Sequence, residues 1–94
     1  MVQIIWIKRA IQDLNDIAEY IAKDSPRYAD LTIEKIFDKT QILKEYPEMG
    51  RVVPEINDNK IRELISGRYR IIYEIKNSEL IEILTVNHSS KLLN

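Results

Sequence analysis

The sequence predicts an α+β domain in which a helical hairpin covers one face of an antiparallel sheet. Three observations indicate this class: an apolar, β-branched N-terminal run, a long helical region interrupted once at Ser25-Pro26, and a C-terminal third that reads as three short strands. With 94 residues the chain forms a single domain, residues 1–94.

The N-terminal elements follow from local patterns. Val2–Ile7 is apolar and lacks glycine and proline, which predicts a buried strand. Residues 9–23 then adopt helical spacing, and this helix is expected to end near Asp24. The predicted apolar stripe comprises Ala10, Leu14, Ile17, Ala18 and Ile21.

A second helix is predicted to begin at Ser25-Pro26, because serine caps an orphan N–H and proline suits the first helical position. It is expected to run to about Tyr46, before Pro47 and Gly50 end it. The connection is so short that the two helices should form an antiparallel hairpin. Its predicted stripe comprises Ala29, Ile33, Ile36, Phe37, Thr40 and Leu43.

The C-terminal half predicts a loop over 51–59 and then an antiparallel meander of strands at 60–65, 69–76 and 80–86. A turn at Asn77-Ser78 would place Ile72 opposite Ile83 and Arg70 opposite Thr85. One face, carrying Tyr69, Ile71, Tyr73 and Ile75, should pack on the helices. The other would carry Arg70, Ile72, Ile81 and Ile83, and this mixed basic and apolar face predicts a partner-binding surface.

Composition excludes several classes of protein. The absence of cysteine excludes a disulfide framework and fits a reducing compartment. No apolar run is long enough to cross a bilayer, so we expect a cytoplasmic protein without membrane contact. The net charge of −1 argues against binding polyanions by bulk charge. No residue pattern indicates a metal or a cofactor.

Several segments together carry a resemblance to a known family. In chain order these are Trp6, Ala10, Asp13-Leu14, Ile17, Tyr20-Ile21, Pro47, Gly50-Arg51, Pro54-Glu55, Arg62-Glu63-Leu64, Tyr69-Arg70-Ile71-Ile72-Tyr73 and Val86-Asn87-His88. With this order and spacing the chain resembles the RelE/ParE toxin superfamily of type II toxin–antitoxin modules. The proline, glycine and arginine pattern of residues 47–55 and the ending at His88 are closer to the ParE branch.

The resemblance implies a toxin, of the kind used in plasmid stabilisation, that inhibits DNA gyrase and growth and is neutralised by a cognate antitoxin. It also implies a dimer or a toxin–antitoxin hetero-oligomer. Two alternatives stay open. One is a RelE-like, ribosome-dependent mRNA endoribonuclease, which would make the protein a metal-independent enzyme. The other is a non-toxic homologue that still binds an antitoxin.

These hypotheses imply two sets of site residues. The target- or antitoxin-binding candidates are Arg62, Arg70, Ile72, Ile83 and His88, and the ribonuclease candidates are Lys60, Arg62, Arg70, His88 and Lys91. In a ribonuclease, His88 would act as base or acid and Lys91 would clamp a phosphate. The chain departs from that branch at its end, where Ser89 or Ser90 replaces an arginine and no late tyrosine follows.

Each candidate also has a simpler structural interpretation. Arg70 could form an exposed ion pair with Glu63 or Glu82, and a lone histidine near a strand end is usually solvated. The remaining assignments are structural: a core containing Trp6, Tyr20, Phe37 and Tyr73, a solvated helix face containing Asp13, Asp16 and Glu19, and an Arg51 that satisfies carbonyl groups at the helix end.

Overall fold

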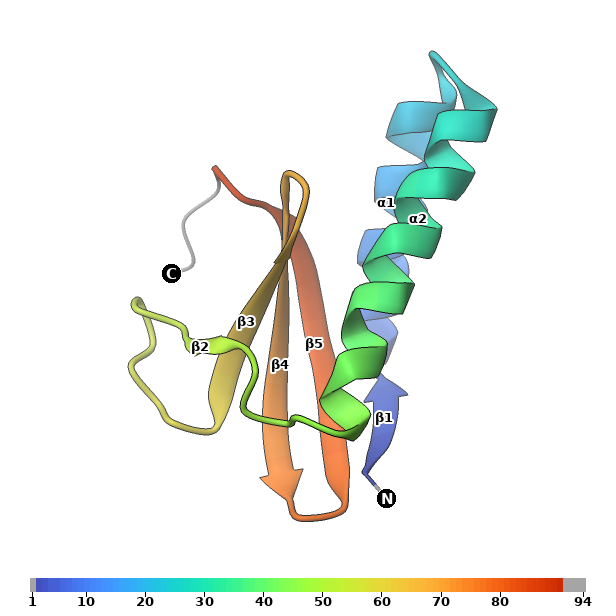
Figure 1. The fold of residues 1–94 in the computed structure, drawn as a ribbon. Coiled ribbons are helices and arrows are strands. Elements are labelled where there is room, and N and C mark those ends of the chain that lie inside the picture. The colour runs from blue at the N-terminus through green and yellow to red at the C-terminus, as the bar shows by residue number, and fades with distance from the viewer. Residues whose placement is uncertain (1, 91–94) are drawn as a thin grey trace.

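The computed structural model describes residues 2–90 and confirms the α+β class. In chain order the elements are β1 (Gln3–Trp6), α1 (Lys8–Ala22), α2 (Pro26–Gln41), the short 3-10 helix η1 (Ile42–Lys44), β2 (Arg51–Val52), β3 (Ile61–Ser66), β4 (Tyr69–Asn77) and β5 (Leu80–His88). The helical hairpin lies against one face of the sheet and extends past one end of it (Figure 1).

The sheet has five strands in the order β1-β5-β4-β3-β2, and only β1 runs parallel to its neighbour, β5. The predicted meander is therefore present as β3, β4 and β5. The N-terminal strand is an edge strand, with Ile4 and Trp6 half-buried and Gln3 and Ile5 exposed, rather than a fully buried one. The predicted loop contains the two-residue strand β2, which pairs with β3.

The helices form as their local patterns predict. Ser25 is the N-cap of α2, where its Oγ accepts a hydrogen bond from the Tyr28 N–H at 3.1 Å, and Pro26 occupies the first turn. Ala10 is fully buried where α1 lies on the sheet. The core between helices and sheet also contains Ile36, Leu43, Leu64, Ile71, Tyr73, Ile81, Ile83 and Val86.

The predicted register of the β4–β5 hairpin is wrong. The turn lies at Ser78-Glu79, because the Asn77 side chain accepts a hydrogen bond from the Glu79 N–H at 2.8 Å and Asn77 pairs with Leu80. Two further irregularities place one extra residue in each strand, so Tyr73 faces Ile83 and Ile72 faces Thr85.

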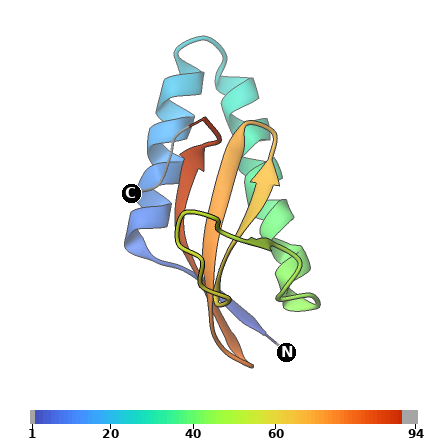
Figure 2. The same cartoon turned by 90° about the vertical axis from the view of Figure 1, so that its left-hand side faces the viewer.

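This shift changes which side chains are available on the outer face. Ile81 and Ile83 are fully buried in the helix-side core, although the sequence analysis placed both on the outer face. Ile72 does point to the outer face, yet it is only 2 % exposed. The 51–60 segment lies across that face (Figure 2), which accounts for the burial of Ile72 and Val53. The isoleucines that were predicted to make the outer face a partner-binding surface, Ile72, Ile81 and Ile83, are therefore not exposed there.

Asp13 fastens α1 to the edge of β5. Its Oδ2 accepts hydrogen bonds from the Thr85 hydroxyl and, at 3.0 Å, from the Val86 N–H. The β1 strand pairs with β5 only as far as Ile83, so this carboxylate satisfies a backbone donor beyond the reach of β1. Asp13 is therefore a structural residue, and the prediction that it belongs to a solvated helix face is wrong.

Candidate functional site

The outer face of the sheet holds a network of four alternating charges, of which the central pair, Arg70 and Glu63, is buried. Arg70 donates to Glu55 at 2.9 and 3.1 Å and, through Nε, to Glu63 Oε1 at 2.7 Å. Glu63 also pairs with Arg51. The Glu63 side chain is fully buried and that of Arg70 is 7 % exposed, so these two charges depend on their partners for compensation.

Arg70 is a structural cation in this arrangement. The hydrogen bonds that Arg70 donates to Glu55, followed by those that it donates to Glu63, raise the pKa of Arg70 further above its already high value. The interpretation of Arg70 as a partner of Glu63 is confirmed, although the pair is buried and not exposed. Because Glu55 belongs to the segment after β2, the network also pins that segment onto the sheet.

Arg62 lies on the opposite side of the sheet from Arg70. Neighbouring residues of a strand alternate between faces, so Arg62 points away from the side that Glu63 shares with Arg70. Its guanidinium donates to the carbonyl groups of Asn59 at 2.9 Å and Gly50 at 3.0 Å. Arg62 therefore braces the segment that follows η1.

Tyr73 anchors the same segment. Its hydroxyl donates to the Pro47 carbonyl at 2.7 Å and accepts from the Gly50 N–H at 3.0 Å. Burial raises the pKa of Tyr73 above its ordinary value. A Cβ at position 50 would lie 2.5 Å from the Glu63 carbonyl oxygen, so only glycine fits here. The proline and glycine of this motif serve to dock the chain on Tyr73.

The other sequence-predicted candidates are scattered. Lys60 is exposed just before β3, and Ile72 and Ile83 are buried on opposite faces, so neither isoleucine can line an exposed surface. His88 is exposed at the end of β5, where its Nδ1 lies 2.8 Å from the Ser90 Oγ. Lys91 falls outside the described residues.

His88 and Arg70 do not share a surface. The His88 ring packs edge-on against Tyr69, with centroids 5.8 Å apart, and Tyr69 belongs to the helix-side face. Arg70 follows Tyr69 and points to the outer face. The prediction that Arg62, Arg70 and His88 line one surface is therefore wrong, because strand alternation places Arg70 on the opposite face of the sheet from Arg62 and His88.

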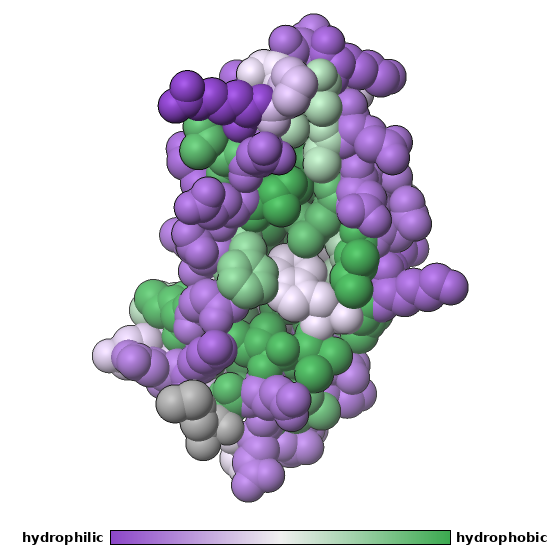
Figure 3. Space-filling model, turned by 90° about the vertical axis from the view of Figure 1, so that its right-hand side faces the viewer, coloured by the Kyte–Doolittle hydropathy of each residue, from purple (hydrophilic) through white to green (hydrophobic). Residues whose placement is uncertain are grey.

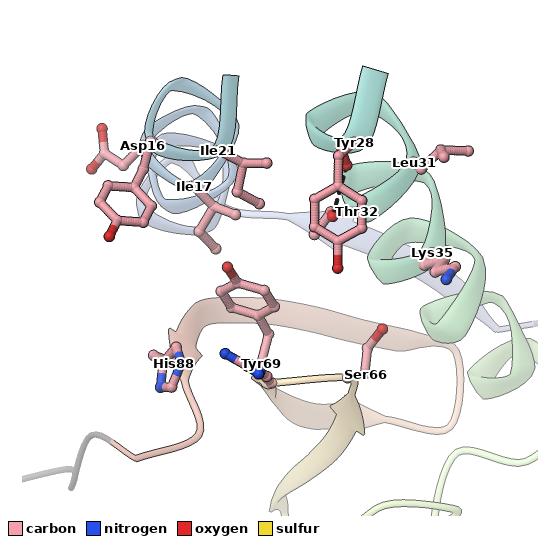
Figure 4. Close-up of a pocket in the computed structure, with 13 residues that line it drawn as sticks. Asp16, Ile17, Ile21, Tyr28, Leu31, Thr32, Lys35, Ser66, Tyr69 and His88 are labelled. Atoms are coloured by element: carbon pink, nitrogen blue, oxygen red, sulfur yellow. Dashed lines mark hydrogen bonds between the residues drawn. The ribbon is translucent and has the colours of Figure 1, made fainter. Parts of the chain in front are cut away.

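The structure instead shows a large groove between the hairpin and the sheet, with a volume of about 910 Å³. It opens where the helices extend past the β3–β4 turn, and Tyr69 points up into it from the sheet (Figure 4). We call it the inner groove. Its lining residues are Asp16, Ile17, Tyr20, Ile21, Tyr28, Leu31, Thr32, Lys35, Ser66, Gly67, Arg68, Tyr69 and His88.

The inner groove combines apolar walls with a positive rim. Tyr20 is 73 % exposed, Tyr28 60 % and Leu31 43 %, so large side chains face solvent there. Lys35 and Arg68 outnumber Asp16 among the charged lining residues. A groove of this kind suits an amphipathic helix with acidic flanks.

The prediction that Tyr20 and Phe37 belong to the core is wrong, because Tyr20 is 73 % exposed and Phe37 is 47 % exposed. The prediction that Tyr73 belongs to the core is confirmed.

Within residues 2–90 no group of three or more histidine, cysteine, aspartate or glutamate side chains could hold a metal ion. None of the helices described is both long and apolar enough to cross a membrane.

Comparison with known proteins agrees with this architecture. Residues 4–93 match the family model for the ParE toxin of type II toxin–antitoxin systems, parDE. The chain is 30 % identical to Toxin RelE2 of Caulobacter vibrioides over 92 residues, covering 98 % of this chain and all of that protein. It is 34 % identical to Putative toxin Y4kP of Sinorhizobium fredii over 87 residues, covering 93 % and 88 %.

A solved structure has the same fold. The chromosomal ParDE toxin–antitoxin system from P. aeruginosa contains a chain that superposes with a TM-score of 0.77, at 21 % identity. The match covers 94 % of this chain and 96 % of that one.

Proposed function

The chain belongs to the ParE toxin family of type II toxin–antitoxin systems, and from that premise we propose that it stops growth by inhibiting DNA gyrase in the cytoplasm. A cognate antitoxin holds it silent. In this proposal the toxin acts by binding and not by cleaving RNA.

The observation that carries this choice is the internal neutralisation of Arg70. Cleavage of RNA without a metal needs a base, an acid and free cations around one phosphate. Arg70 is engaged by Glu55 and Glu63, and Arg62 faces the other side of the sheet and binds carbonyl groups. His88 lies on the helix side. No three of these groups converge on one phosphate-sized site.

Charge supports the same choice. Contacts to phosphates dominate the affinity of proteins for nucleic acids. The chain has a net charge of −1, and the two arginines of the outer face are balanced by Glu55 and Glu63. A ribosome-docking nuclease would need a stronger positive field than this surface supplies.

We place the antitoxin in the inner groove. An amphipathic helix is about 10–12 Å across with its side chains, and it could lay an apolar face on Ile17, Tyr69 and Leu31. Acidic residues beside that face would meet Lys35 and Arg68. Occupation of the groove would cover Tyr28 and Tyr20, which are the most exposed large apolar side chains of the molecule's described part.

Expression of the chain alone tests the choice of target. Labelled thymidine and labelled amino acids would be followed over minutes after induction, and purified toxin would be added to a gyrase supercoiling assay. We expect thymidine incorporation to fall first and supercoiling to be inhibited. An initial fall in amino-acid incorporation, with cleaved mRNA, would instead establish the ribonuclease alternative.

Binding measurements test the groove separately. Leu31→Glu and Tyr28→Glu place acidic groups on exposed groove positions, and each should weaken antitoxin binding at least tenfold by calorimetry. Tyr46→Glu is the matched control, because Tyr46 is 56 % exposed and lies outside the groove. Equal affinities for all three variants would place the antitoxin elsewhere.

A further inference from the structure

The helical hairpin has a second apolar depression on the side away from the sheet. It lies between α1 and α2 and has a volume of about 500 Å³. We call it the outer furrow. Its lining residues are Ile11, Leu14, Asn15, Ala18, Asp30, Ile33, Glu34 and Phe37. On this side of the molecule, hydrophobic side chains run down the middle between hydrophilic flanks (Figure 3).

Two large apolar side chains of the outer furrow are exposed to solvent. Ile11 is 49 % exposed and Phe37 is 47 % exposed. The Phe37 ring stacks on Trp6 of β1, with centroids 6.3 Å apart and planes inclined by 19°, which fixes its position. A rigid, contiguous apolar strip with a polar border is typical of an interaction site.

The charges of the furrow have the opposite sign to those of the inner groove. Its charged lining residues are both carboxylates, Asp30 and Glu34, and within residues 2–90 neither forms an ion pair. The inner groove carries Lys35 and Arg68 against Asp16. The two sides of one hairpin therefore select for partners of opposite charge.

We propose that the outer furrow is a docking site for a partner protein that presents a helix with an apolar stripe flanked by lysine or arginine. The apolar stripe would contact Ile11, Ile33 and Phe37, and the flanking cations would pair with Asp30 and Glu34. Because the furrow and the inner groove lie on opposite sides of the hairpin, this partner binds whether or not the antitoxin is present. The proposal does not depend on gyrase being the target.

Charge also argues against a second copy of this chain as the occupant. A two-fold symmetric interface brings the same patch of both copies together. Asp30 and Glu34 of each copy would then face those of the other across an apolar contact, and like charges oppose such an interface. An acidic antitoxin helix is disfavoured for the same reason.

A pair of designed helical peptides tests the proposal. Both carry leucine at helical spacing, and one has lysine flanks and the other glutamate flanks. We expect the lysine peptide to bind the full chain at least tenfold more tightly, with an affinity that falls as salt rises. Amide signals of Ile11, Ile33 and Phe37 should shift in NMR spectra, and those of Ile17 and Tyr69 should not.

A charge reversal makes the test specific. The double substitution Asp30→Lys and Glu34→Lys should invert the preference in favour of the glutamate peptide. Glu45→Lys with Glu79→Lys is the matched control, because it changes the net charge equally at exposed positions outside the furrow and should leave the preference intact. The proposal fails if both doubles behave alike, if the shifts map to the inner groove, or if the furrow instead mediates self-association in sedimentation experiments.

Discussion

The carboxylate of Asp13 on α1 accepts the Val86 N–H of β5 at 3.0 Å, across 73 residues of sequence. Asp13→Ala removes the acceptor for this donor and for the Thr85 hydroxyl. A lost acceptor for part-buried donors costs about 1–3 kcal/mol, so we expect a loss of that size in the free energy of unfolding, measured with urea. Asp38→Ala, at an exposed site on α2, is the control and should change stability by less than about 0.5 kcal/mol.

Tyr73→Phe tests the docking of the segment after η1. The change leaves the Gly50 N–H and the Pro47 carbonyl without the hydroxyl that now joins them. We expect a destabilisation of about 1–3 kcal/mol and faster hydrogen exchange at the Gly50 amide. Tyr46→Phe, at an exposed position, should leave both quantities unchanged. Unaltered exchange at Gly50 in the Tyr73 variant would contradict the anchoring role.

Tyr73 also predicts a dependence of stability on pH. Burial raises the pKa of Tyr73, so the folded chain holds the phenol proton more tightly than the unfolded chain does. The contribution of Tyr73 to the free energy of unfolding is fully present below the ordinary tyrosine pKa of about 10. It is lost as pH rises through the pKa that Tyr73 has in the folded chain. The difference in free energy of unfolding between the native chain and Tyr73→Phe should therefore shrink above a pH of about 10. Parallel curves for the two proteins would refute this.

The buried network predicts an unequal response to removal of its members. Arg70→Ala leaves the buried Glu63 with Arg51 alone, and breaking such a pair costs about 3–5 kcal/mol. Glu55→Ala should cost less, because its side chain is 23 % exposed and Arg70 keeps Glu63. Urea denaturation of both variants and of their double measures the coupling.

The control for the network is Arg27→Ala, which removes an exposed arginine with no ion pair among residues 2–90. It should stay within about 0.5 kcal/mol of the native chain. If Arg70→Ala were as mild as Arg27→Ala, the network would not hold the segment after β2 in place. Any loss of toxicity in Arg70→Ala has to be corrected for the unfolded fraction.

The features that the sequence predicts well are local ones. Helical spacing identifies the buried residues Ile36 of α2 and Leu43 of η1, and Ser25 caps α2 as its position predicts. The register of β5 is not a local feature and was predicted wrongly. It depends on a turn one residue later than expected and on two irregularities in the pairing with β4 that tertiary packing selects. That error moved Ile83 from the core to the outer face.

Non-local pairing explains most of what was missed at the site. Nothing local links Glu55 to Arg70, which lie 15 residues apart and meet only because the segment after β2 folds over the sheet. The inner groove was missed since Tyr20 and Tyr28 lie off the predicted stripes. The groove could have been predicted from large aromatic residues at helix positions flanked by polar ones, because exposed apolar side chains that cluster mark interaction sites.

The pairing of Gln3 with Leu80 has a consequence for how each molecule is made. β1 pairs only with β5, which comes after the other described strands in the sequence, so this pairing closes over a long sequence separation. Until β5 leaves the ribosome, the apolar stripes of the two helices have no complete sheet to cover. The sheet that the helices cover is therefore complete only once β5 has been synthesised.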